Sequence, residues 1–217
     1  MKFTWKTEII PILLVVISII LGCYFYSVFP DQVPMHWNIN GEVDGWGSAF
    51  SGAFILPIIL FGIYFLFVLI PLIDPKKEKY QQFEKVYRVF RLLIMLVMFA
   101  VYLIASDNAL GYAIRVEIWI PVIIGLLFLV MGNYFGKIKP NWFMGIRTPW
   151  TLSNEEVWNK THRLGGKLFM VLGLFMISTP LWQTKSATMF WLVMVPVLLV
   201  TIVPIIYSYI IYRRIKK

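Results

Sequence analysis

Six long apolar runs dominate this chain and restrict it to one class of protein. They span residues 9–29, 53–73, 86–106, 118–135, 168–182 and 189–212. A helix rises about 1.5 Å per residue, so about 20 apolar residues cross the bilayer's hydrocarbon core, which is about 30 Å thick. With 59% hydrophobic and only 14% charged residues, the chain is too apolar for a soluble domain. The sequence predicts an all-α integral membrane protein with six transmembrane helices.

Two of these runs have unusual starts. The third contains Arg88 and Arg91 in its first turns, and we expect both side chains to snorkel to the headgroups along their aliphatic stems. The fifth is short, so we expect it to extend backward through Gly165 and Gly166. These two glycines would also permit a bend into the fifth span.

The placement of Lys and Arg predicts the orientation in the membrane. Of the 20 basic residues, all but Arg115 and Lys185 lie before the first run, after the last, in the second and fourth connections, or, for Arg88 and Arg91, in the first turns of the third run. Short segments rich in Lys and Arg stay in the cytoplasm. We therefore predict that both termini are cytoplasmic. Topology also accounts for the net charge of +9, which in a soluble protein would suggest a nucleic-acid partner, and we expect none.

Cys23 raises an alternative for the first run. Lys2 and Lys6, an apolar run and then Leu21-Gly22-Cys23 faintly resemble a lipoprotein cleavage site. The bulky Leu21 and the apolar continuation beyond Cys23 favour an uncleaved first span. A single cysteine cannot form a disulfide within the chain.

Residues 29–50 contain no Lys or Arg and form the predicted extracellular loop. Asn40-Gly41 is a strong hairpin signal, because both central residues of a two-residue type I′ turn need positive φ. We expect residues 35–39 and 42–46 to pair around it. The hairpin would display these side chains at the membrane surface: His36, Trp37, Trp46, Asp31, Glu42 and Asp44. It is either a docking site for a cationic or amphipathic ligand or a cap whose Trp residues anchor in headgroups.

Metal and catalytic sites have little support. His36, Glu42 and Asp44 could supply ligands, but the only other histidine, His162, is predicted across the membrane, so one chain cannot build a two-His zinc site. The sequence has no phosphate-binding glycine loop, nucleophile elbow or metalloprotease helix motif. We expect no metal, no cofactor and no enzymatic activity.

Residues 136–167 form the predicted cytoplasmic loop. Thr148 precedes a proline and is pushed toward extended backbone, so residues 147–151 are expected to be stiff and non-helical. Ser153 and Glu156 form a capping box that predicts a helix from Asn154. Its apolar face suits a helix lying at the membrane interface.

That interfacial helix has two interpretations. It is either a basic surface helix that fixes topology or a site for a partner. Arg147, His162 and Arg163 could bind lipid phosphates as readily as a protein.

The spans themselves carry little chemistry. None has a charged residue near its centre, which disfavours an ion-coupled carrier, because such carriers usually hold ionisable residues at membrane depth. Gly132 and Gly136 form a small-xxx-small pattern on the fourth span that could let another helix approach closely.

Two motifs resemble known sequences. IRTPWTL, followed by Val157-Trp158 and His162-Arg163, resembles the SdpI immunity-protein family of bacterial membrane proteins. FPDQVPMHWNINGEVDGWGS looks like the N-terminal domain of unknown function that is commonly fused to that family. The resemblance implies an N-terminal domain over residues 1–75, with outer loop 30–51. It implies an SdpI-like domain over residues 76–217, with motif loop 136–167.

The resemblance also implies two sets of binding residues. The inner set is Arg147, Thr148, Pro149, Trp150, Thr151, Leu152, Trp158 and Arg163, with His162 added from the same segment. The outer set is Pro30, Pro34, His36, Trp37, Gly41, Asp44 and Trp46.

The function that the resemblance implies is immunity. Such a protein lies in the bacterial cytoplasmic membrane, gives resistance to a secreted killing peptide and relays the signal to a cytoplasmic repressor. We expect the peptide at the outer face, membrane lipids around the spans, and the repressor or another protein at the inner loop.

Two alternatives remain open. One is a transporter or flippase for an amphipathic solute, which would use the proline-containing spans. The other is a membrane enzyme whose outer-surface chemistry would use Asp31, His36, Glu42 and Asp44.

Overall fold

The computed structural model describes residues 3–182 and 186–216. Lys2, Lys185 and Lys217, three of the basic residues used to predict orientation, lie outside the described residues. The helices are α1 (Trp5–Val28), α2 (Ala49–Ile73), α3 (Glu84–Ala109), α4 (Val116–Phe135), α5 (Pro149–Ser153), α6 (Glu155–Ile177) and α7 (Ser186–Ile215). Short 3-10 helices are η1 (Lys77–Gln82) and η2 (Thr179–Leu181), and the strands are β1 (Gln32–Trp37) and β2 (Val43–Ser48).

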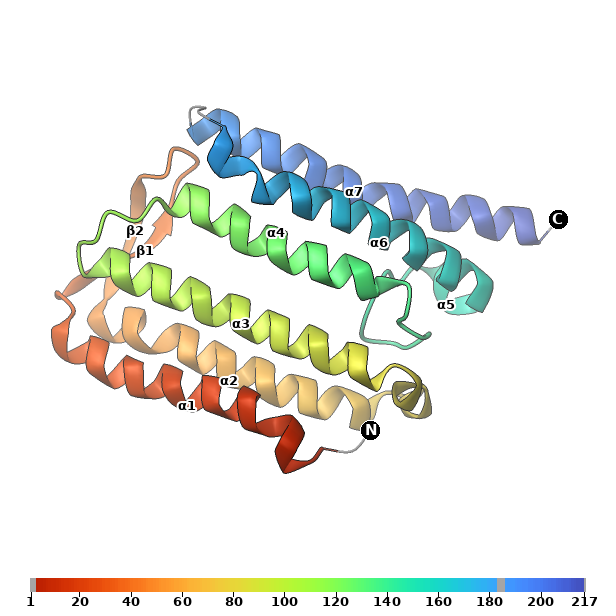
Figure 1. Ribbon diagram of the computed structural model, residues 1–217, viewed down its shortest axis with the longest axis horizontal. Coiled ribbons are helices and arrows are strands. Elements are labelled where there is room, and N and C mark those ends of the chain that lie inside the picture. Colours follow the sequence, from red (N-terminus) through yellow and green to blue (C-terminus); the bar gives the residue numbers. More distant parts are fainter. Residues whose placement is uncertain (1–2, 183–185, 217) are drawn as a thin grey trace.

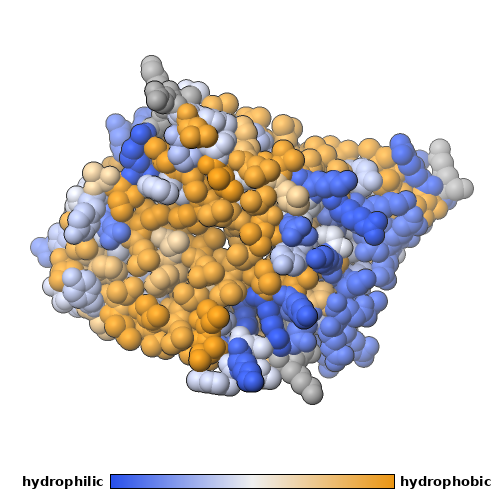
Figure 2. All heavy atoms as spheres, in the orientation of Figure 1, coloured by the Kyte–Doolittle hydropathy of each residue, from blue (hydrophilic) through white to orange (hydrophobic). Residues whose placement is uncertain are grey.

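Within the described residues, six helices are long and apolar enough to cross a membrane: α1, α2, α3, α4, α6 with η2, and α7. Figure 2 shows a broad hydrophobic surface between hydrophilic patches that lie mainly toward the ends of the molecule. The prediction of an all-α membrane protein with six spans is confirmed. The expected interfacial helix and the fifth span are one helix, α6, which begins at Glu155 and continues without interruption through Gly165 and Gly166.

The strands lie at one end of the bundle, called here the hairpin end, and η1, α5 and both chain termini lie toward the other, called the motif end (Figure 1). This arrangement agrees with an even number of crossings. That the motif end faces the cytoplasm stays a prediction, which rests on the distribution of Lys and Arg.

The spans pack as two groups of three. Helices α1, α2 and α3 contact one another, as do α4, α6 and α7, and α3 joins the two groups through α4. The division into residues 1–75 and 76–217 stays a prediction. In space, α3 packs with the two helices that precede it in the chain.

Glycine permits the close contact between α4 and α6. A Cβ added to Gly132 would lie 2.6 Å from the carbonyl oxygen of Gly166, and one added to Gly125 would lie 2.8 Å from that of Gly173. Small residues let two backbones approach where no hydrophobic force from water holds helices together. The expectation that Gly132 admits a neighbouring helix is confirmed, and Gly166 lies at this contact.

Arg91 corrects the expectation of snorkelling. Its side chain is 1% exposed, and its guanidinium donates to both carboxylate oxygens of Glu8 at 2.9 Å. Tyr64 donates to the same carboxylate at 3.2 Å. A charge removed from water needs a partner. The contacts of Glu8 with Arg91 and Tyr64 therefore hold α1, α2 and α3 together. Arg88 pairs with Glu84 one turn earlier.

We predict that Gly132→Ala lowers the free energy of unfolding by about 1–3 kcal/mol, because the added methyl meets backbone that cannot move aside. Gly62→Ala is the matched control, since nothing lies within 4 Å of its Cβ position. Thermal unfolding in detergent compares the two variants. Equal unfolding temperatures would contradict the glycine contact.

We also predict that Arg91→Met destabilises the protein by about 3–5 kcal/mol, because Glu8 is left as a buried, uncompensated charge. The double variant Glu8→Gln with Arg91→Met removes both charges and should recover part of this loss. The same unfolding measurement tests it. A double variant less stable than Arg91→Met alone would argue against the ion pair.

Candidate functional site

The predicted hairpin is present with a different register. Strands β1 and β2 pair antiparallel with Gln32 opposite Ser48, whereas the sequence predicted pairing of residues 35–39 with 42–46. The hairpin is therefore longer at its open end, where β2 runs directly into α2.

The predicted type I′ turn is wrong. Such a turn needs positive φ at both Asn40 and Gly41. Gly41 has φ +79°, but Asn40 does not have a positive φ, since no described residue other than glycine does. The Asn38 N–H donates to the Glu42 carbonyl at 2.8 Å, which closes a three-residue connection. The Asn38 side-chain oxygen also accepts from the backbone N–H groups of Asn40 and Glu42, at 2.8 and 3.1 Å. This local bonding competes with the shorter turn.

The outer residues divide between two surfaces. His36 and Asp44 lie 2.5 Å apart, Nδ1 to Oδ1, on the exposed surface, and Trp46 is 58% exposed. Trp37 and Gly41 line a cavity under the hairpin, and the His36 side chain also borders it. Pro30 is exposed and Pro34 is buried.

The polar side chains of the hairpin do not assemble a metal site. Glu42 accepts a hydrogen bond from the Asn38 amide at 3.1 Å, while His36 pairs with Asp44. Among residues 3–182 and 186–216, no three His, Cys, Asp or Glu side chains come together as a metal site requires.

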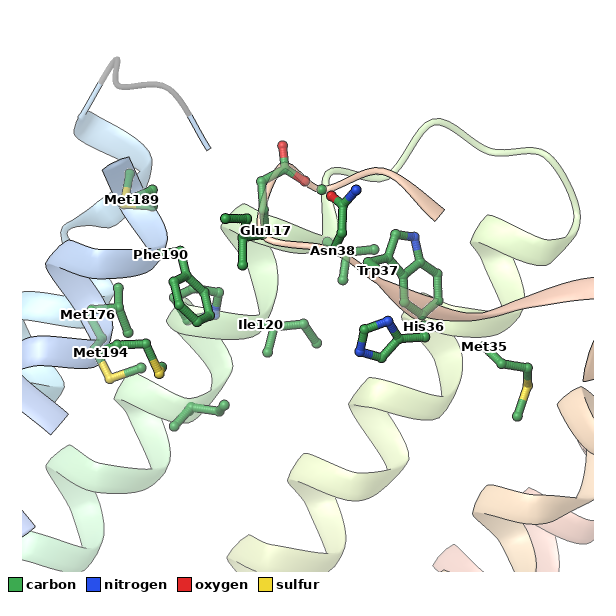
Figure 3. A pocket seen from close by; sticks show the side chains of 16 residues that line it. Met35, His36, Trp37, Asn38, Glu117, Ile120, Met176, Met189, Phe190 and Met194 are labelled. Atoms are coloured by element: carbon green, nitrogen blue, oxygen red, sulfur yellow. The ribbon is translucent and has the colours of Figure 1, made fainter. Parts of the chain in front are cut away.

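The hairpin cavity, as we name it, has a volume of about 360 Å³ and lies between β1, the first turns of α4, Met176 of α6 and the first turns of α7. Figure 3 shows the labelled Met176, Met194 and Phe190 on one side and Met35, His36 and Trp37 on the other. Its lining is mainly apolar, with Glu117 and Asn38 among the few polar side chains. Helices α4, α6 and α7 thus form its walls. Strand β1, which packs on α2 and α3 of the first group, covers it.

A second cavity of about 310 Å³ lies between β1, the end of α1, α2 and α3. Met35 and Trp37 line both cavities. Strand β1 therefore separates two apolar spaces at the hairpin end.

Gly41 holds the turn on α4. A Cβ at this residue would lie 3.0 Å from Oε2 of Glu117. The carboxylate also accepts from Arg115 Nε at 2.9 Å, through Oε1. Both the positive φ and the close approach require glycine here.

At the motif end, Asn141 folds the loop between α4 and α5. Its buried side-chain oxygen accepts from the N–H groups of Phe143 and Met144, at 2.9 and 2.6 Å, and its amide donates to the Lys139 carbonyl at 2.9 Å. The sequence interpretation missed Asn141. The pair Pro140-Asn141 was the available signal, since both residues favour turns.

Asp74, at the end of α2, connects this loop to the first helix group. One carboxylate oxygen accepts from the Tyr80 hydroxyl at 2.8 Å and from the Trp142 N–H at 3.0 Å. Burial, together with Asp74, raises the pKa of Tyr80, so its hydroxyl remains a donor. No local pattern indicates the contact between Asp74 and Trp142, because these residues lie 68 positions apart in the chain.

The prediction that residues 147–151 are non-helical is partly wrong. Thr148 is extended, with φ −113° and ψ 161°, as expected before proline. Pro149, however, begins the short helix α5, because Thr148 caps it and accepts from the Thr151 N–H at 3.1 Å. Proline fits the first helical position, where its missing N–H has no partner to lose.

The predicted capping box at the start of α6 is also wrong. The N-cap is Asn154, whose side-chain oxygen accepts from the N–H groups of Glu156 and Val157 at 2.9 and 3.0 Å. Ser153 ends α5 instead and donates to the Trp150 carbonyl.

Trp158 and His162 are fully buried on α6. The Trp158 indole N–H donates to the Ile138 carbonyl at 2.8 Å, and its ring stacks on His162 with centroids 4.0 Å apart. His162 Nε2 accepts from the Ile146 N–H at 3.0 Å, and Nδ1 lies 2.8 Å from the Trp158 carbonyl. The imidazole is therefore neutral with its proton on Nδ1. It holds the loop and is not available to lipid phosphates.

The inner set thus divides by exposure. Thr148, Thr151, Trp158 and His162 are buried. Arg147, Pro149 and Arg163 are exposed. Trp150 packs beside Tyr209 of α7 at 5.0 Å, and Leu152 is partly buried. Only the exposed residues can meet a partner directly.

Helix α6 joins the two candidate sites. His162 lies in the motif, and Met176, about four turns later, lines the hairpin cavity. Gly166 and Gly173 lie between them and face α4.

Residues 137–208 match the SdpI/YfhL protein family, and residues 13–61 match a domain of unknown function (DUF1648). The stretch that matches the SdpI/YfhL family contains α5, α6 and most of α7, and the stretch that matches DUF1648 contains the hairpin. The family resemblance predicted from the two motifs is confirmed.

The whole chain is also similar to a protein named Immunity protein SdpI from Bacillus subtilis (strain 168). The two are 24% identical over 211 residues, which cover 97% of this chain and 98% of that protein. The similarity therefore includes both the SdpI/YfhL and the DUF1648 regions. No solved structure matches the chain.

We predict that Gly145→Ala in the SdpI/YfhL region destabilises the motif loop more than Gly111→Ala destabilises its own turn. Both glycines have positive φ, which costs another residue about 1–2 kcal/mol. Only at Gly145 would the new Cβ also collide with the His162 ring, whereas nothing lies within 4 Å at Gly111. Limited proteolysis of the loop and thermal unfolding compare the two variants. Equal losses would show that the contact with His162 is unimportant.

Proposed function

We propose that this chain is an immunity protein of the bacterial cytoplasmic membrane that captures a secreted killing peptide at the hairpin end. The observation that carries the proposal is the hairpin cavity, an apolar space covered by the aromatic strand β1. The similarity to Immunity protein SdpI along 97% of the chain supports the choice of ligand.

The orientation that this function requires follows from charge. The chain termini, the connections at the motif end and the helix turns beside them together hold most of the Lys and Arg residues, and residues 29–50 hold none. Both termini would therefore be cytoplasmic, and the hairpin would face the outside. A peptide arriving from outside meets the hairpin before it meets the spans.

A relay would act through α6. A peptide that binds beside Met176 would stabilise one position of α6 against α4, provided that the helix has two positions that the peptide distinguishes. The other end of α6 contacts the motif loop through His162. The exposed Arg147 and Arg163 would then present a changed surface to a cytoplasmic repressor.

Protection itself needs only binding. A captured peptide cannot disrupt the bilayer, and no chemical step has to follow. The exposed pair of His36 and Asp44 would form part of the surface on which the peptide docks. Membrane lipids around the spans are the remaining proposed partner.

Expression in a host sensitive to the killing peptide tests the function. We expect the native chain to raise survival, and Trp37→Ala to reduce that protection about tenfold, because aromatic residues in cavities contribute strongly to binding. Trp119→Ala is the control, since Trp119 is 51% exposed and does not line the cavity. Membrane levels of each variant are measured by immunoblot. Equal killing with and without the native chain would refute immunity.

A further inference from the structure

We infer that the hairpin cavity binds an apolar segment of a cationic amphipathic peptide, and that Glu117 at its rim receives a cation of the same peptide. This inference rests on the proposed function, whose ligand it defines by chemistry.

The size and lining of the cavity fit side chains of varied shape. Its volume of about 360 Å³ falls in the range of ligand cavities, about 300–1,000 Å³. Four methionines line it: Met35, Met176, Met189 and Met194. The unbranched, polarisable thioether adapts to different apolar partners. Such a lining suits an apolar stretch of peptide better than one rigid small molecule.

The charge around the cavity selects a cationic ligand. Residues 29–50 contain Asp31, Glu42 and Asp44 but no Lys or Arg. Glu117 is paired with Arg115, which donates to its Oε1, and its Oε2 lies on the side of Gly41. With Arg115 counted, Asp31, Glu42, Asp44 and Glu117 still leave a net negative charge among the described residues of the hairpin and the rim. A cationic group near this carboxylate gains attraction, and an acidic ligand is repelled.

The same charges disfavour a lipid as the occupant. An acyl chain could fill the apolar space, but an anionic phospholipid would bring its phosphate to the rim beside Glu117 and the acidic hairpin. Repulsion between the phosphate and these carboxylates opposes binding of the lipid. A peptide with an apolar face and adjacent lysines satisfies both the lining and the rim.

The test uses the full chain in nanodiscs of zwitterionic phosphatidylcholine. The probe is a fluorescent amphipathic helix of Leu and Lys, and a Leu and Glu helix of the same length is its counterpart. Binding is measured by anisotropy after subtraction of empty nanodiscs. We expect the native chain to bind the Leu and Lys peptide about tenfold more tightly than its counterpart, a difference typical of charge selection.

Two variants fill the cavity from different walls, Met194→Trp on α7 and Ile120→Phe on α4. Each should weaken binding of the Leu and Lys peptide about tenfold, because a filled cavity cannot admit the apolar segment. Leu198→Trp is the matched control, one turn further along α7, 55% exposed and outside the lining. It should bind as the native chain does. Glu117→Gln should reduce the preference for Lys over Glu.

Three results would overturn the inference. They are equal affinity of the native chain for both peptides, unchanged binding by both filled variants with unaltered unfolding temperatures, or equal weakening by Leu198→Trp.

The survival assay separates this inference from the proposed function. If the native chain protects the host and both filled variants protect equally, the cavity is not the site and immunity stands. If the native chain does not protect but its binding of the probe depends on Met194, immunity fails and the peptide site stands.

Discussion

The close approach of α4 and α6 is the contact on which the rest of the arrangement depends. Inside a bilayer, helices gain nothing from hiding apolar surface from each other, so packing depends on how near their backbones come. Paired glycines at two levels bring these helices together. With α4 fixed, α6 carries its first turns into the motif loop and its last turns to the wall of the hairpin cavity. One helix therefore has its ends in both candidate sites.

Polar contacts between the helix groups gather near the ends of the bundle, where backbone leaves the helices. Asp74 joins the end of α2 to the motif loop by accepting from the Trp142 N–H. At the hairpin end the contact is one of packing, with Gly41 close against the Glu117 side chain of α4. Within the first group, the pair of Glu8 and Arg91 holds α1 to α3. Because an unpaired polar group away from water is costly, the bond from Trp142 to Asp74 holds the two groups together more firmly than apolar packing alone.

The sequence predicts the six spans and the hairpin, because both depend on local patterns: apolar length for the spans, and Asn-Gly between aromatic stretches for the hairpin. The errors come from bonds that compete with those patterns. The Asn38 side chain changes the turn, and Thr148 turns a proline stretch into a short helix. Arg91 meets a partner 83 residues away, which no local pattern reveals. The cavity is equally hidden, since its walls come from four separate elements.

The position of β1 between two apolar spaces has a consequence for any molecule that enters either of them. Met35 and Trp37 contribute to both linings, so a rotation of the Trp37 side chain that widens one space narrows the other. Occupants on opposite sides of the strand would therefore antagonise each other, each lowering the other's affinity by the same factor. Binding in the two cavities is therefore linked through β1. Lipid tails that enter the second cavity, beside α2 and α3, would lower the affinity of the hairpin cavity for its ligand.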